Sequence, residues 1–301
     1  MSIRVESVTK KYGNQKALDD ISFTVNSGEI VGFLGPNGAG KSTMMKIITG
    51  FLHPDKGNVW INETIVEGDT LDIRHQIGYL PENNPLYTDL YVAEYLEYVA
   101  GIYHLKAVKS RVNEMIRLTG LLSEKHKKIG TLSKGYRQRV GIAQALIHDP
   151  SILILDEPTS GLDPSQIVEI RQLIRNISTS KTVMLSTHIM QEVEALCDRI
   201  MIINHGKIVA TDTPSNIKAL ATANSQKILV EFAEPINSEK LKDIEGIIEI
   251  QNISEKTWLI SGGGNDLRPL IFRFALANNL TILTLNKQES SLENVFLEII
   301  K

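Results

Sequence analysis

The chain has 301 residues, and at about 150 residues per domain this length predicts two domains. Its 42% hydrophobic and 22% charged residues exclude an intrinsically disordered chain, and its net charge of −3 gives no sign of a protein that coats a polyanion. A single cysteine, Cys197, excludes an intrachain disulfide. With no stretch of about 18 apolar residues and no secretory signal in residues 1–6, we expect a soluble, cytoplasmic protein.

Apolar and polar residues alternate in the first 30 positions, which predicts half-buried antiparallel strands around residues 3–5 and 21–25. Two further short strands, at 59–61 and 65–66, are expected to form a hairpin around residues 62–63.

Short, continuous apolar runs then alternate with helical stretches, which predicts a parallel sheet with helices on its faces. The runs are typical of strands buried on both sides and comprise residues 30–34, 152–155 and 183–185. Helices are expected at residues 41–52, 138–148, 164–179 and 189–197. Residues 86–130 are also helical in pattern, with Tyr91, Tyr95, Tyr98 and Ile102 at the spacing of one helix face.

The composition changes near residues 211–226, where Thr213 followed by Pro214 predicts the start of a helix. Beyond it, strands are expected at 227–232, 247–253, 257–261 and 281–286, and helices at 238–244 and 266–278. This βαββαβ order is typical of a small ferredoxin-like unit. A final helix is expected at 291–300, with Ser290 and Glu293 at capping-box spacing and Leu292, Val295, Phe296 and Ile299 on one face.

One motif after the first buried strand predicts a phosphate-binding loop and reads Gly35-Pro36-Asn37-Gly38-Ala39-Gly40-Lys41-Ser42. Its glycines allow backbone N–H groups to turn toward a phosphate, and the following helix directs its positive dipole end at the same anion. Lys41 is placed to reach the β and γ phosphates, and the Ser42 hydroxyl to bind Mg²⁺. A chance glycine-rich turn is the alternative. The expected nucleotide contacts are Gly35, Asn37, Gly38, Ala39, Gly40, Lys41, Ser42 and Thr43.

Two carboxylates, Asp156 and Glu157, follow the buried strand at 152–155. The carboxyl ends of parallel strands line the ligand crevice of such a sheet, so both side chains are expected beside the phosphate loop. Asp156 is suited to bind Mg²⁺ directly or through water, and Glu157 to polarise a water that attacks the γ phosphate. Without the upstream loop, a polar strand end would be the simpler interpretation.

Between these motifs lies Leu132-Ser133-Lys134-Gly135-Tyr136-Arg137-Gln138-Arg139, which resembles the signature motif of ATP-binding cassette (ABC) ATPases, usually L-S-G-G-Q. Thr159-Ser160-Gly161-Leu162-Asp163 is similar to the D-loop of that family, and Ser186-Thr187-His188 to its switch-histidine segment. Tyr12 occupies the position at which the family keeps an aromatic residue that stacks on adenine. The resemblance covers residues 3 to about 215.

The resemblance implies an α/β, P-loop NTPase cassette over residues 1–215, with an antiparallel β subdomain and a helical subdomain at about 86–148, followed by a small α+β domain at 222–301. It also implies that two cassettes pair head to tail around ATP, with Ser133 and the N–H of Gly135 on the γ phosphate of the partner's nucleotide. His188 would hold the γ phosphate and the attacking water, and Asp163 would support the dimer interface.

Two departures from the family pattern bear on the site. Glu82 stands where the family's Q-loop usually has glutamine; it would still take part in Mg²⁺ and water coordination, but it adds negative charge near the triphosphate. Lys134 and Tyr136 replace Gly and Gln of the signature, and Lys134 would add positive charge near the nucleotide. Ser133 and Gly135, the positions with a phosphate role in the family, are unchanged.

In both departures the chain resembles an exporter branch of the family, which has separate membrane subunits and C-terminally extended ATPase subunits. Residues 291–297 are similar to the terminal motif of that branch. Residues 79–87 resemble the gliding-motility-associated ATPase subunits of this branch. The resemblance therefore implies an ATP-hydrolysing exporter subunit that binds ATP and Mg²⁺ and forms a homodimer. A separate transmembrane permease would hold it on the inner face of the cell membrane, and the permease would mainly set the transported substrate.

Three alternatives stay open. A soluble ABC ATPase acting on ribosomes or DNA would need no permease, although the single cassette, the lack of a long heptad stretch and the near-neutral charge disfavour a nucleic-acid role. The C-terminal unit would either bind a regulatory ligand or, more simply, have a structural or dimer-supporting role. The tyrosines at 87, 91, 95, 98 and 103 would either contact the permease or pack in the helical subdomain's own core.

Overall fold

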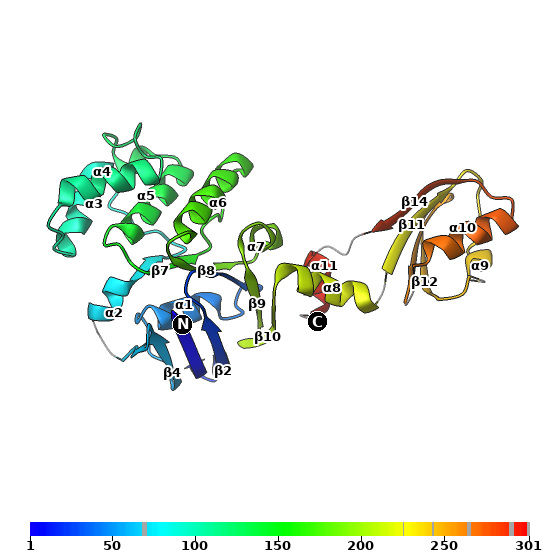
Figure 1. Ribbon diagram of the computed structural model, residues 1–301, viewed down its shortest axis with the longest axis horizontal. Helices are drawn as coiled ribbons and strands as arrows, with labels where there is room; N and C mark the ends of the chain where they lie inside the picture. Colours follow the sequence, from blue (N-terminus) through cyan, green and yellow to red (C-terminus); the bar gives the residue numbers. More distant parts are fainter. Residues whose placement is uncertain (68–70, 225, 243, 264–265, 289–291, 300–301) are drawn as a thin grey trace. The chain divides into compact units, whose positions relative to one another are not determined.

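The computed structural model describes residues 1–67, 71–224, 226–242, 244–263, 266–288 and 292–299. The chain forms two compact units, Met1–Thr213 and Pro214–Lys301 (Figure 1). The accessory domain was expected to begin at residue 222. The second unit begins earlier, at Pro214, because helix α8 (Pro214–Asn224) is part of this unit. Within the described ranges, no helix combines the length and the apolar character needed to cross a membrane.

A six-stranded sheet forms the centre of the first unit, in the order β10-β9-β3-β8-β7-β6. Strands β9, β3, β8, β7 and β6 are parallel, and the edge strand β10 runs antiparallel to β9. The middle strands β3, β7 and β8 are buried along their whole length, as their apolar runs predict. The bounds are β3 Ile30–Leu34, β6 Ile77–Leu80, β7 Ile152–Asp156, β8 Thr182–Thr187, β9 Arg199–Asn204 and β10 Lys207–Asp212.

A second, antiparallel sheet in the order β2-β1-β4-β5 shares one hydrophobic core with helix α1 (Lys41–Ile48) and with one face of the parallel sheet. The turn between β4 and β5 places Asn62 at φ 44° and Glu63 at φ 70°. Two consecutive left-handed residues are what a two-residue hairpin turn requires, so the predicted hairpin is confirmed. The bounds are β1 Ile3–Tyr12, β2 Gln15–Val25, β4 Lys56–Ile61 and β5 Thr64–Ile65.

Helices α3, α4 and α5 pack together beside the parallel sheet and form the helical part of the first unit (Figure 1). In the first unit, the expected end of one helix and the expected start of another differ most from the structure. Helix α1 ends at Ile48 because Gly50, at φ 72°, turns the chain away, and α5 begins at Lys134 because the Ser133 hydroxyl caps it. The bounds are α2 Leu71–Gln76, α3 Val92–Ile102, α4 Val108–Leu118, a 3₁₀ turn Ile129–Thr131, α5 Lys134–Leu146, α6 Pro164–Ser178 and α7 Met190–Leu196.

Tyr91, Tyr95, Tyr98 and Ile102, which share helical spacing, differ in burial, and only Tyr95 of the four is buried. Tyr95 is buried and donates a hydrogen bond to Gln144 Oε1 at 2.6 Å, whereas Tyr98 is 48% and Ile102 is 56% exposed. Tyr91 precedes the helix as its N-cap. Helical spacing fixes neighbours along a helix, but which side faces the core depends on the elements that pack against it.

The second unit contains a four-stranded antiparallel sheet in the order β12-β13-β11-β14, and its elements follow one another as βαββαβ. Helix α9 ends earlier than expected, at Leu241. Helices α8 and α11 pack against each other, and Leu292, Val295 and Phe296 of α11 are buried. Ser290 of the predicted capping box lies outside the described residues. The bounds are β11 Gln226–Phe232, α9 Ser238–Leu241, β12 Ile247–Ser254, β13 Thr257–Gly262, α10 Arg268–Ala277, β14 Ile282–Gln288 and α11 Leu292–Ile299.

Gly32 allows helix α7 to approach strand β3 closely, and its replacement is expected to destabilise the first unit. A methyl group at this position would lie 2.2 Å from Cγ1 of Val193. Gly32→Ala should cost about 1–3 kcal/mol through overpacking, measured as a lower midpoint of thermal unfolding. The control is Gly101→Ala in α3, where a methyl group meets nothing within 4 Å, and where helix propensity predicts a gain of about 0.5 kcal/mol. A wild-type midpoint for Gly32→Ala would contradict the packing described.

Candidate functional site

The loop between β3 and α1 closes around the side chain of Lys41. Its Nζ donates hydrogen bonds to the carbonyl oxygens of Gly35 at 2.8 Å and Pro36 at 3.3 Å, and the lysine is only 6% exposed. Gly40 precedes the helix with φ 111°, and a methyl group there would lie 2.5 Å from the carbonyl oxygen of Ala17, so only glycine fits. The loop therefore places a buried cation at the positive end of α1.

Asp156 ends β7, and two hydroxyl groups donate hydrogen bonds to the same oxygen of its carboxylate. Ser42 Oγ lies 3.2 Å from Asp156 Oδ1, and Ser186 Oγ donates to that atom from the neighbouring strand β8. The register of the two strands pairs Asp156 with Ser186, which is why the carboxylate and this hydroxyl meet. The arrangement joins the start of α1 to the carboxyl ends of β7 and β8.

Glu157 binds two partners at once in a buried position. Its Oε1 lies 3.4 Å from Lys41 Nζ, and its Oε2 lies 2.9 Å from His188 Nδ1. Glu157 has φ 50°, an uncommon left-handed conformation for a residue other than glycine, and its N–H donates to the backbone oxygen of Ser186 at 3.1 Å. The turned backbone directs the carboxylate between the lysine of the loop and the histidine that follows β8.

The residues of this cluster come from loops that are far apart in the sequence but leave the sheet at one edge. Strands β3, β7 and β8 are parallel neighbours, so their carboxyl ends coincide. We name this group, comprising Lys41, Ser42, Asp156, Glu157 and His188, the strand-end cluster. Its chemistry fits both expected ligands, because a triphosphate matches the loop N–H groups and the buried lysine. The two oxygen donors Ser42 and Asp156 match the preference of Mg²⁺.

A second group of predicted residues lies together at the N-termini of α5 and α6. Ser133 caps α5 by accepting from the N–H of Tyr136 at 3.4 Å, and Asp163 caps α6 by accepting from the N–H of Gln166 at 2.9 Å. Hydrogen bonds from the Ser165 hydroxyl and the Gln166 N–H lower the pKa of Asp163. Gly135 lies against the Gln166 side chain, since a methyl group on it would come within 2.6 Å of that amide. We name Ser133, Gly135 and Asp163 the helix-start surface.

Tyr12 and Glu82 stand apart from both groups. Tyr12 ends β1 and is 54% exposed, and Glu82 is exposed in the loop that follows β6. Among the described residues, no hydrogen bond or ion pair links either side chain to the strand-end cluster. Their predicted contacts with adenine and Mg²⁺ stay predictions.

Four buried polar residues beside the strand-end cluster were not predicted as site residues. They are Thr159, Ser186, Thr187 and Glu192. Ser186 binds Asp156, as described above, while both threonine hydroxyls donate to the carboxylate of Glu192. Thr159 lies in the D-loop segment, and Ser186 and Thr187 lie in the switch-histidine segment. Membership of these motifs was the signal by which the three residues could have been predicted. Glu192 lies on a short helix after the histidine, and nothing in its local sequence distinguishes it from an exposed acid.

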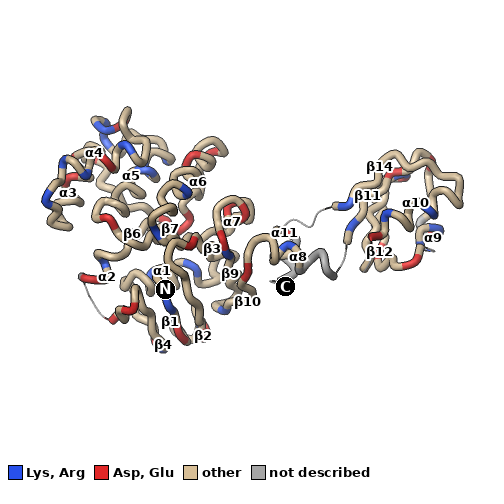
Figure 2. The backbone as a smooth tube through the Cα atoms, viewed as in Figure 1, with Lys and Arg blue, Asp and Glu red and all other residues tan. Residues whose placement is uncertain are grey.

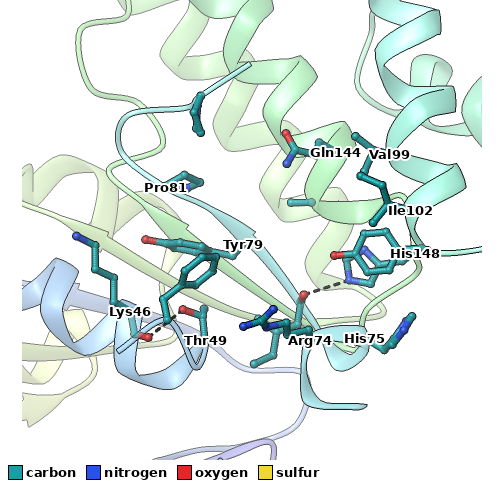
Figure 3. Close-up of a pocket in the computed structure, with 15 residues that line it drawn as sticks. Lys46, Thr49, Arg74, His75, Tyr79, Pro81, Val99, Ile102, Gln144 and His148 are labelled. Carbon is teal, nitrogen blue, oxygen red and sulfur yellow. Dashed lines mark hydrogen bonds between the residues drawn. The ribbon is translucent and has the colours of Figure 1, made fainter. Parts of the chain in front are cut away.

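A groove of about 730 Å³ separates the sheet from the helical part of the first unit (Figure 3). Its walls are largely apolar and aromatic, and Lys46 and Arg74 add positive charge, while no carboxylate occurs among its described lining residues. Burial lowers the pKa of His148 to about 4, and its ring stacks on Tyr103 with centroids 4.0 Å apart. The apolar wall comprises Phe51, Ile77, Tyr79, Pro81, Pro85, Val99, Ile102, Tyr103 and Ala145.

The comparisons agree with the motifs. The sequence matches the family profile described as ABC transporter over residues 18–160, and a profile described as an AAA domain, putative AbiEii toxin of a type IV TA system, over residues 128–194. The chain is 32% identical to the linearmycin resistance ATP-binding protein LnrL of Bacillus subtilis (strain 168), over 99% of this chain and 97% of that protein. It is 33% identical, with the same two coverages, to the bacitracin transport ATP-binding protein BcrA of Bacillus licheniformis.

Solved structures support the same assignment. The ATP-binding cassette MJ0796, described as a dimeric post-hydrolysis state bound to ADP and Pi, matches with TM-score 0.65 and 29% identity over 70% of this chain and 98% of that chain. CbiO1 from Clostridium perfringens, described as part of the ABC transporter complex CbiONQ, matches with TM-score 0.66 and 29% identity over 72% and 90%. The chain therefore belongs to the ATP-binding subunits of ABC transporters, and it is an ATPase.

Proposed function

We propose that this chain is the ATP-hydrolysing subunit of an exporter, and that it works as a homodimer on a separate permease. The observation that carries the proposal is the buried contact of Glu157 with Lys41 and His188 at the end of the parallel strands. Export is favoured by relatives named for linearmycin resistance and bacitracin transport. The proposed role in gliding motility rests on residues 79–87 alone and stays a prediction.

Hydrolysis would use the strand-end cluster in a definite order. The triphosphate binds the loop N–H groups and draws Lys41 away from Glu157, because it offers more negative charge than one carboxylate. The freed carboxylate accepts a proton from the attacking water, and His188, held 2.9 Å from Glu157, orients that water. Mg²⁺, held by Ser42 and Asp156 with Glu82 as a further ligand, would neutralise charge on the phosphate oxygens.

The helix-start surface would complete the site of a second copy of the chain. Ser133 is exposed at the N-terminus of α5, where free N–H groups and the helix dipole attract a phosphate. Lys134 lies against Gly161 of the D-loop, since a methyl group on that glycine would come within 2.3 Å of Lys134 Nζ. The signature residues and the D-loop thus form one surface, and Asp163 would contact the partner copy. Tyr12 would stack on the adenine.

The groove is the proposed contact with the permease. Its apolar lining suits the apolar side chains of a permease segment, and Lys46 and Arg74 suit an acidic residue on that segment. Burial raises the pKa of Tyr79, which lines the groove, and the charges of Asp156 and Glu82 raise it further. Through the permease, the subunit would lie at the inner face of the cell membrane. Basic and acidic residues are interspersed along the chain (Figure 2). This mixed distribution of charge argues against a nucleic-acid partner.

Lys41→Ala is expected to weaken ATP binding at least tenfold. The change removes the cation of the phosphate loop and takes from the buried Glu157 carboxylate one of its two partners. Titration of the purified chain with a fluorescent ATP analogue measures the affinity. Lys109→Ala, which removes an exposed lysine from α4, should bind as the wild type does. If Lys41→Ala bound ATP with the wild-type affinity, the loop would not be the nucleotide-binding site.

Glu157→Gln should bind ATP normally but hydrolyse it at least a hundredfold more slowly, because an amide cannot accept the proton of water. With ATP bound and not consumed, the variant should accumulate as a dimer in size-exclusion chromatography. Phosphate release and the elution volume are the two readouts. Normal turnover by this variant would show that another group accepts the proton.

Ile102→Glu should prevent association with a permease encoded beside this chain, because it places a carboxylate in the apolar wall of the groove. Co-purification from detergent-solubilised membranes measures association, and the ATPase rate of the isolated chain should be unchanged. Leu122→Glu, at an exposed leucine of the helical part outside the groove, is the matched control. Recovery of ribosomes or DNA in place of the permease would favour a soluble ABC ATPase.

A further inference from the structure

Glu192 is a fully buried carboxylate between the loop that holds Glu157 and the loop that holds His188; we name Glu157 and His188 the catalytic pair. It is 0% exposed in the first turn of α7, and the hydroxyls of Thr159 and Thr187 both donate to it, the second at 2.9 Å. Both threonines are themselves buried. Among the described residues, no lysine, arginine or histidine lies within ion-pair distance of this carboxylate.

Stability alone does not account for an acid at this position. A buried carboxylate without a cation carries a desolvation cost that two hydroxyl donors offset only in part, so an apolar side chain of similar volume would be easier to fold. The two hydroxyl donors lie close to Glu157 and His188 in the sequence. Thr159 follows Glu157 by two residues, and Thr187 directly precedes His188. One carboxylate therefore joins the segment after β7 to the segment after β8.

We propose that Glu192 is a positioning residue for hydrolysis, which sets the contact between Glu157 and His188 through Thr159 and Thr187. Each oxygen of the carboxylate binds one threonine, so the distance between the two loops is fixed by a single rigid group. The Thr187 hydroxyl also accepts from the N–H of Ile189 at 3.1 Å, which fixes the backbone on both sides of the histidine. Through Thr159 the same carboxylate holds the beginning of the D-loop.

The inference rests on the proposed roles of Glu157 and His188, and it gives Glu192 no contact with substrate. Loss of the carboxylate should therefore lower kcat and leave the KM for ATP unchanged, because the phosphate loop is not part of this network. A general loss of folding would change both constants together with the unfolding temperature.

The test compares Glu192→Leu, which removes both acceptors, with Glu192→Gln, which has one oxygen to accept and one amide to donate to a hydroxyl. In Glu192→Leu, we expect kcat to fall at least tenfold while KM stays within twofold of the wild-type value. In Glu192→Gln, we expect kcat to return most of the way to the wild-type value. Thr159→Val and Thr187→Val, which keep the side-chain shape, should each lower kcat several-fold even if the leucine variant does not fold. Glu194→Gln removes a carboxylate from the exposed side of the same helix and is the control.

Glu157→Gln is measured beside these variants to separate the two claims. If it is slow while Glu192→Leu and both valine variants turn over ATP at the wild-type rate, the positioning role is wrong and the catalytic pair stands. If Glu157→Gln is as active as the wild type, Glu157 is not the base, and the proposed catalytic pair is wrong whatever the Glu192 variants show. A parallel fall of kcat, ATP affinity and unfolding temperature in all Glu192 and threonine variants would reduce Glu192 to a structural residue.

Discussion

The buried ion pair of Lys41 and Glu157 is the interaction on which the site depends. Two opposite charges held away from water are costly unless their geometry is fixed and their remaining hydrogen bonds are satisfied. Here two loop carbonyls hold the lysine, while His188 and the left-handed backbone at Glu157 hold the acid. On the proposed mechanism, a triphosphate would replace Glu157 as the partner of Lys41 because it carries more negative charge. Nucleotide binding would then also free the proposed base.

Much of this site was predictable because its motifs are local. The phosphate loop needs glycines and a lysine at fixed spacing, and Asp156-Glu157 needs only to follow a buried strand, so each is visible in a few consecutive residues. Their convergence follows from the parallel sheet, since the carboxyl ends of β3, β7 and β8 share one edge. The contact of Glu157 with both Lys41 and His188 is a matter of side-chain direction, which spacing does not give.

What the sequence did not predict depends on packing between distant segments. Glu192 is one of two acidic residues on a short helix, and only the fold brings Thr159 and Thr187 onto it. The tyrosines of the helical part divide into buried and exposed ones according to the neighbours of α3. The groove arises between elements from four parts of the chain. In the second unit, the element order is readable from alternating apolar runs, but the pairing of α8 with α11 is not.

In the proposed homodimer, the strand-end cluster of one copy is completed by the helix-start surface of the other. Mixing two inactive variants tests it most directly: Lys41→Ala, with an intact helix-start surface, and Ser133→Asp, which keeps a good N-cap but repels phosphate. We predict that each variant alone is inactive, and that the mixture hydrolyses ATP well above the sum of the separate rates, since mixed dimers contain one intact composite site. If mixing restores no activity although mixed dimers form, the second copy does not complete the site.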